Sequence, residues 1–130
     1  MITGLKVTGI LQQMEESKYN FQLTGSRYFT PNEAGNRDYD FFVQKSDDVE
    51  AWLQSFNFTT ISKKTYGDSN CYAVYRSFAN ELNPQVDVQI VNDFKMKAIV
   101  QDAMRRSGLN PTSQVEWNFS FEIYKRFCKS

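Results

Sequence analysis

Three aspartates occupy apolar segments, where an acidic side chain is costly unless it is paired, hydrogen-bonded or bound to a metal. Asp38 and Asp40 are two residues apart at the start of the segment Asp38–Gln44, and Asp87 lies inside the apolar segment Gln85–Val91. The two-residue period of a strand places Asp38 and Asp40 on one face, with their Cα atoms roughly 6.6–7 Å apart. Oxygen ligands without histidine or cysteine favour hard cations, so these residues predict a site for Mg²⁺ or Mn²⁺.

A glycine-serine turn is the second feature that could do chemistry. Gly25, Ser26 and Arg27 follow the predicted strand Tyr19–Thr24. Glycine lets the backbone approach a ligand, and Ser26 offers a hydroxyl and an N–H to phosphate oxygens. Arg27 could contact a triphosphate or be an ordinary loop cation, and the sequence favours neither reading. Two metal ions about 3.5–4 Å apart would clamp the attacking and leaving oxygens of an in-line displacement at phosphorus.

The composition excludes several other chemistries. The 130 residues include no histidine, which removes Ser-His-Asp catalysis and every zinc site that needs imidazole. Fifteen basic residues balance fifteen acidic ones, so there is no strong nucleic-acid footprint. Cys71 and Cys128 could form one bridge, but reduced thiols are favoured because the N-terminus shows no signal peptide. With no apolar run of membrane-spanning length, we expect no membrane contact and a cytoplasmic protein, in the host cytoplasm if the chain is viral.

The elements that must position these residues follow from hydrophobic periodicity and from turn signals. Ser46 is a suitable N-cap for one helix, and Ser113 with Glu116 resembles a capping box for the last one. Residues 27–37 read as a loop with room for one helical turn. Strands are expected at 19–24, 38–44, 58–61, 71–77 and 85–91, and helices at about 7–18, 46–56, 93–107 and 115–127.

Two helices have predicted apolar faces that bear on the site. The helix at 93–107 is expected to pack through Met96, Ile99, Val100, Ala103 and Met104. The last segment also alternates as a strand would, but its four-residue repeat favours a helix. Its aromatic side chains are expected in the core rather than on a base-stacking platform. That repeat is Val115, Phe119, Ile123 and Phe127.

Three cations near the aspartates have less specific interpretations. Lys95 and Lys97 are expected on a solvated helix face. Arg76 could reach a phosphate, but an arginine at a strand end usually faces water. None of the three is therefore included in the predicted site.

The elements predict one domain over residues 1–130, of the α+β (mixed α/β) class, with a mixed sheet flanked by helices. The segments LTGSR (23–27), RDYDFFV (37–43) and VDVQIV (86–91) carry a resemblance over roughly residues 7–107. The chain resembles the DNA-polymerase-β-like, or minimal, nucleotidyltransferase superfamily, and looks most similar to small stand-alone prokaryotic or phage members. The resemblance implies that Gly25 and Ser26 hold a nucleoside triphosphate. It also implies that Asp38, Asp40 and Asp87 bind the two metal ions.

The resemblance implies a two-metal-ion nucleotidyltransferase that moves a nucleoside monophosphate from a triphosphate to an acceptor and releases pyrophosphate. The acceptor could be a protein, an RNA or a small molecule, and the neutral net charge disfavours a long RNA. The large C-terminal domain that many relatives use for the acceptor is not recognisable here. The alternative is a non-catalytic binding or inhibitor module that retains the nucleotidyltransferase fold.

Overall fold

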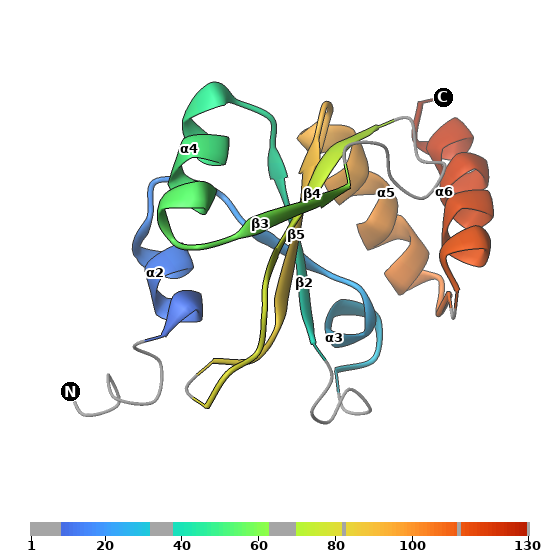
Figure 1. Cartoon of the computed structure of the whole chain (residues 1–130). Coiled ribbons are helices and arrows are strands. Elements are labelled where there is room, and N and C mark those ends of the chain that lie inside the picture. Colours follow the sequence, from blue (N-terminus) through green and yellow to red (C-terminus); the bar gives the residue numbers. More distant parts are fainter. Residues whose placement is uncertain (1–8, 32–37, 63–69, 82, 112, 130) are drawn as a thin grey trace.

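The structure is a computed structural model that describes residues 9–31, 38–62, 70–81, 83–111 and 113–129. The helices are α2 (Ile10–Glu16), α3 (Ser26–Phe29), α4 (Asp47–Ser55), α5 (Phe94–Arg106) and α6 (Gln114–Lys129). The strands are β1 (Gln22–Thr24), β2 (Tyr39–Gln44), β3 (Thr59–Ser62), β4 (Cys71–Ser77) and β5 (Val86–Val91). Helices and strands are mixed along the chain, with β3, β4 and β5 in succession and followed by α5 and α6 (Figure 1).

The five strands form one mixed sheet in the order β1-β2-β5-β4-β3. β2 and β5 are parallel, and the other three neighbouring pairs are antiparallel. A parallel pair needs a long crossover, which is supplied here by α4, β3 and β4. The predicted α+β class, with a mixed sheet flanked by helices, is therefore confirmed.

Helices cover both faces of the sheet, and the two layers differ in size (Figure 1). On one face, α2 and α4 pack through Met14, Val49 and Leu53 against strand residues such as Val88 and form the larger core cluster. On the other face, α5 and α6 form a small cluster of Val100, Met104 and Phe121. Successive side chains of a strand point to opposite faces of the sheet. The odd-numbered side chains of β2 and the even-numbered side chains of β5 point to the larger cluster, and the others point to the face of α5 and α6.

Most of the predicted elements are present, with shifted boundaries. β1 is shorter than the predicted strand at 19–24, and β2 begins one residue after Asp38. The short helix α3 occupies the predicted loop with its helical turn. The first helix runs over 10–16, and residues 7–8 of its predicted range lie outside the described residues, as do 32–37 and 63–69. Among the described helices, none has the length and apolar content needed to cross a bilayer.

The predicted apolar faces of two helices are wrong in part. α6 is a helix as predicted, but its four-residue repeat faces solvent, and Phe119 is 69% exposed. α6 packs instead through Trp117, Phe121 and Tyr124. On α5, Ile99 is exposed. Periodicity identifies residues that share a face of a helix, but it does not decide which of two apolar faces meets the sheet.

The cysteines take different environments. Cys71 is buried in β4, whereas Cys128 is exposed near the end of α6, and no disulfide joins them.

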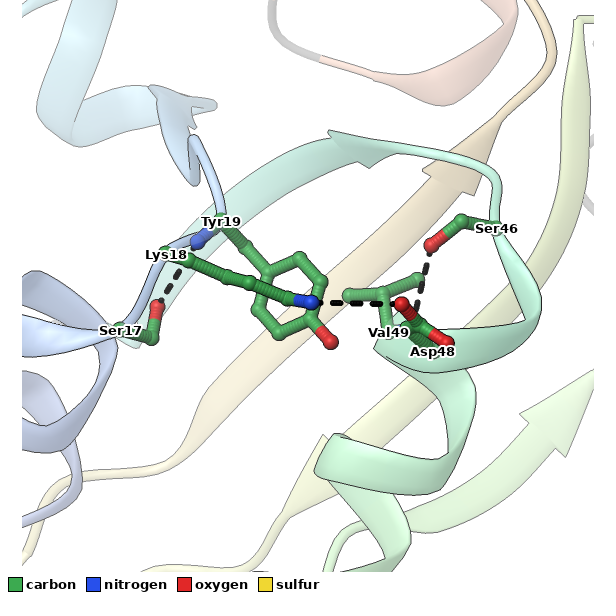
Figure 2. Close-up of polar contacts among 6 residues, drawn as sticks. All are labelled: Ser17, Lys18, Tyr19, Ser46, Asp48 and Val49. Atoms are coloured by element: carbon green, nitrogen blue, oxygen red, sulfur yellow. Dashed lines mark hydrogen bonds and ion pairs between the residues drawn. The ribbon is translucent and has the colours of Figure 1, made fainter.

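α4 begins where the sequence places an N-cap, and its first turn contacts the segment after α2 (Figure 2). The hydroxyl of Ser46 accepts a hydrogen bond from the backbone N–H of Val49 at 3.1 Å. This bond satisfies one of the N–H groups that have no partner inside the helix. The ion pair between Lys18 Nζ and Asp48 Oδ2 spans 3.3 Å, but the two side chains are 70% and 68% exposed. The cap therefore contributes more to stability than the ion pair does.

Replacing Ser46 with Ala should lower the free energy of unfolding by about 1 kcal/mol, because it removes the cap from α4. Replacing Lys18 with Met, which removes the exposed ion pair, should change the same quantity by less than about 0.5 kcal/mol. Urea denaturation followed by circular dichroism measures both. Equal losses in the two variants would contradict this ranking.

Candidate functional site

Four polar side chains from four neighbouring strands form one line across the sheet, here named the polar row. Thr24 of β1 lies opposite Asp40 of β2, and Asp40 lies opposite Asp87 of β5. Arg76 of β4 completes the polar row, because it lies opposite Asp87. Side chains at directly opposed positions share a face of the sheet. The polar row faces the α5 and α6 layer rather than the larger core.

Asp87 and Arg76 form a bidentate ion pair in the polar row. The Arg76 Nε donates to Asp87 Oδ1 at 2.8 Å, and its Nη2 donates to Oδ2 at 3.0 Å. The Asp87 side chain is only 15% exposed and that of Arg76 is 29% exposed. Paired, well-aligned hydrogen bonds of this kind are the geometry in which a guanidinium best compensates a half-buried carboxylate. The apolar segment around Asp87 is therefore compatible with its charge.

Among the described residues, no cation forms an equivalent ion pair with Asp40, and its carboxyl favours the protonated form. Burial, which is the largest cause, and the negative charges of Asp87 and Asp38 together raise the pKa of Asp40 to about 7, while the charge of Arg76 opposes the shift. Burial disfavours the ionised form because the carboxylate loses hydration. Near neutral pH, Asp40 is therefore present in both protonation states.

A cavity of about 130 Å³ opens over the polar row, and a buried lysine reaches it from α5. Lys97 is only 2% exposed, and its Nζ donates to Gln89 Oε1 at 2.9 Å. The same ammonium lies 4.5 Å from the centre of the Trp117 ring and 5.2 Å from that of Phe42, within the range of cation–π attraction. The cavity is lined by Thr24, Gly25, Asp40, Val74, Asp87, Gln89, Lys97 and Trp117.

Gly25 brings the backbone of the turn after β1 directly against Asp40. Its φ is +71°, a conformation that side chains with a Cβ rarely adopt. A Cβ added there would lie 2.6 Å from Asp40 Oδ2, closer than real Cβ atoms come. The position therefore needs glycine for two independent reasons, backbone conformation and proximity to the carboxylate.

A buried hydrogen-bonded pair fixes the end of β1 to α5. The hydroxyl of Thr24 donates to Gln101 Oε1 at 2.8 Å, and Gln101 Nε2 donates to the carbonyl of Leu23 at 3.0 Å. Gln101 is 1% exposed. This pair sets where the turn at Gly25 begins and thus its distance from the polar row.

The structure brings three of the six predicted site residues together: Gly25, Asp40 and Asp87 all line the cavity. Asp38 precedes β2, is exposed, and accepts a hydrogen bond from Gln85 Nε2 at 2.9 Å. It still lies near enough to Asp40 for its charge to raise the pKa of that carboxyl.

Ser26 and Arg27 lie on α3 and are not among the residues that line the cavity. The Arg27 guanidinium packs 3.8 Å from the centre of the Tyr39 ring. Tyr39 packs against the larger core, on the opposite face of the sheet from Asp40. In this conformation Arg27 is therefore directed away from the polar row.

Sequence reasoning missed the two cations of the site. Lys97 was expected on a solvated face and is buried, because it shares the α5 face that carries Val100 and Met104, whereas Lys95 is exposed as expected. Val100 and Met104 follow Lys97 by three and seven residues, and this helical spacing could have indicated that Lys97 lies on the buried face. Arg76 was expected to face water, and only the register between β4 and β5 reveals its partner Asp87.

The donor atoms of the cavity suit a hard cation, although Asp87 is already engaged by Arg76. Asp40 and Asp87 supply carboxylate oxygens, the ligands that Mg²⁺ and Mn²⁺ prefer. The pKa of Asp40 is raised mainly by burial and further by the charges of Asp87 and Asp38, and a bound cation would favour the ionised form of this carboxyl. Within the described ranges, no group of three or more Asp, Glu or Cys side chains is arranged around one point. Any ion held here would also need backbone, solvent or ligand oxygens.

The pKa of Asp40 makes stability depend on pH in a predictable direction. The ordinary value is 3.8, so between about pH 4 and pH 7 the folded protein holds a proton that the unfolded chain has lost. The free energy of unfolding therefore falls as the pH rises through this window. Replacing Asp40 with Asn removes this loss, so the variant should gain about 2–4 kcal/mol relative to wild type between pH 4 and pH 8.

Urea denaturation at several pH values measures this gain. Asp48→Asn, which alters an exposed carboxyl on α4, is the control, and its free energy of unfolding relative to wild type should change little between pH 4 and pH 8. A difference between Asp40→Asn and wild type that is the same at pH 4 and pH 8 would contradict the raised pKa.

Comparisons of the chain with protein-family models, with curated proteins and with solved structures find no match. They therefore show no family for it. The function must follow from the chemistry of the cavity and of the polar row.

Proposed function

We propose that this chain is a metal-dependent nucleotidyltransferase, which moves a nucleoside monophosphate from a nucleoside triphosphate to an acceptor and releases pyrophosphate. The observation that carries the proposal is the placement of Asp40 and Asp87 side by side on parallel strands, facing a cavity that the Gly25 turn also lines. A buried acid such as Asp40, which lies beside the charge of Asp87, is costly for the fold alone. A role in binding cations together with phosphate would account for its presence.

The arrangement of strands supports the nucleotidyltransferase fold that the sequence resembles. The Gly25-Ser26 turn ends β1, the antiparallel β2 carries Asp40, and β5 brings Asp87 beside it from a distant part of the sequence. This is the order in which the resemblance assigns the triphosphate turn, the first acids and the third acid.

Asp40 and Asp87 are the residues that would hold the metal ions, with Asp38 available at the rim. Bound Mg²⁺ would supply Lewis-acid stabilisation of the charge that develops on the reacting phosphate. Arg76 donates one hydrogen bond to each oxygen of Asp87, and each of these oxygens keeps a second lone pair that could face a cation.

Lys97 provides a positive charge for the triphosphate. Its ammonium lies in the cavity with the carboxylates and is held there by Gln89 and by the ring of Trp117. A buried ammonium attracts an anion more strongly than a solvated one, because little water competes for it. Lys97 thus compensates the negative charge that the triphosphate brings into a cavity already lined by acids.

One observation favours a second candidate, a non-catalytic binding module. The bidentate pair between Arg76 and Asp87 satisfies both carboxylate oxygens without any ligand. A fold that retained its acids only for structure would use this pair. The enzyme should bind a triphosphate only when Mg²⁺ is present and should transfer its nucleoside monophosphate to an acceptor. The binding module should show no transfer.

The first test compares Asp40→Asn and Asp87→Asn with wild type. Titration calorimetry with Mg²⁺ and each of the four ribonucleoside triphosphates should show metal-dependent binding to wild type for at least one of them. Asp40→Asn should abolish this binding, because Asp40 adjoins the Gly25 turn. Asp87→Asn should largely retain binding but reduce transfer of α-labelled nucleotide to lysate components by about 10²–10³-fold, because we expect its contact to strengthen in the transition state.

Asp102→Asn on the exposed side of α5 is the matched control and should leave both quantities unchanged. Absence of binding to any triphosphate in wild type would refute the proposed function. Binding without transfer to any acceptor would favour the non-catalytic module.

The second test separates two lysines that lie two residues apart. Lys97→Met keeps the length of the buried side chain and removes its charge, so triphosphate affinity should fall about 10–100-fold. Lys95→Met removes the same charge from an exposed position and should leave the affinity within about twofold. Circular dichroism checks that both variants fold. Equal effects of the two substitutions would mean that Lys97 acts only through the general field of the protein.

A further inference from the structure

α6 has two apolar faces, and within the described part of the chain only one of them packs against other elements. Trp117 and Phe121 face α5 and the sheet, and Trp117 also lines the cavity. The opposite face carries a stripe of large apolar side chains that are open to solvent. These are Val115 (79% exposed), Phe119 (69%), Ile123 (39%) and Phe127 (73%), here named the outer stripe.

The residues of the outer stripe form a continuous surface along α6. They repeat every four residues over the length of a sixteen-residue helix, so their side chains lie next to one another. In Figure 1, α6 is the outermost element on its side of the sheet. Contiguous exposed apolar surface of several hundred square ångströms is typical of an interaction site.

Charges on the same face indicate what kind of partner fits. Glu116 lies near the beginning of α6 and Arg126 near its end, and at 3.6 residues per turn both fall within the arc of the outer stripe. The face is therefore acidic at one end and basic at the other. A helix with the same pattern, running in the opposite direction, would place unlike charges together at both ends.

We propose that a second copy of this chain docks on the outer stripe, with the two α6 helices antiparallel. A two-fold axis near residue 121 sets Phe119 of each copy opposite Ile123 of the other, and Val115 opposite Phe127. The same register sets Glu116 opposite Arg126 twice. A surface that complements itself in this way is what a symmetric dimer requires.

The area of the outer stripe sets the expected strength of the dimer. A covered phenylalanine buries about 150–250 Å², so the stripes of two copies supply on the order of 1,000 Å². This value is near the lower limit for a specific interface, so we expect a weak dimer that forms only at high protein concentration. The dimer would brace α6 from outside and so hold Trp117 in the cavity, although its existence does not depend on the proposed activity.

Sedimentation velocity between about 1 and 200 µM tests the proposal. Wild type should change from monomer to dimer over this range. Phe119→Glu should remain monomeric at all concentrations, because it places two carboxylates inside the apolar contact. Phe78→Ser, which removes an exposed phenylalanine beyond the end of β4, is the control and should dimerise as wild type does. A wild type that stays monomeric at 200 µM, or a dimer that Phe119→Glu does not weaken, would overturn the proposal.

Charge exchange tests the antiparallel register. Glu116→Arg alone and Arg126→Glu alone should each weaken the dimer at least about tenfold, because each places like charges opposite one another twice. An equimolar mixture of the two variants should form a heterodimer with two attractive pairs, and the double variant should dimerise by itself. Circular dichroism confirms that each variant is folded. Failure of both the mixture and the double variant to recover association would overturn the antiparallel arrangement.

Discussion

The parallel register between β2 and β5 is the constraint on which the site depends. It sets Asp40 directly beside Asp87, at the separation of neighbouring strands, about 4.7–4.9 Å. Two ionised carboxylates so close together, partly removed from water, repel one another. The protein answers each charge differently: Arg76 pairs with Asp87 through two hydrogen bonds, and Asp40 holds its proton up to a pKa of about 7. The polar row thus has a charge balance that changes whenever a cation or an anion enters the cavity.

One face of the sheet carries the main apolar core, and the other carries the buried polar residues of the site. α2 and α4 close one face with a large apolar cluster, which supplies most of the hydrophobic stabilisation. On the other face, α5 directs Lys97 and Gln101 inward at positions that an ordinary core would fill with leucine or valine. These polar residues fix the end of β1, bring a cation into the cavity and leave room above the carboxylates. The small cluster around Val100 and Phe121 closes the remainder of this layer.

α6 connects the cavity with the surface of the molecule. Its inner face contributes Trp117, whose ring packs against the ammonium of Lys97, and its outer stripe lies on the opposite side of the same helix. A helix moves largely as a rigid unit, so an event that restrains the outer stripe also restrains Trp117. Association and ligand binding would then act on one element, even though they use different residues.

The sequence by itself determined the order and type of the elements and the mixed sheet flanked by helices, and it selected Gly25, Asp40 and Asp87 as members of one candidate site. These inferences follow from two-residue and 3.6-residue periodicity, the Ser46 cap, and aspartates in apolar strands. Tertiary structure alone decided the pairing of Asp87 with Arg76, the burial of Lys97, and the exposure of Asp38 and Phe119. Each of these depends on strand register or on which face of a helix meets the sheet, and both are set by packing between segments distant in sequence. Periodicity shows which residues lie together, but only packing shows what lies opposite them.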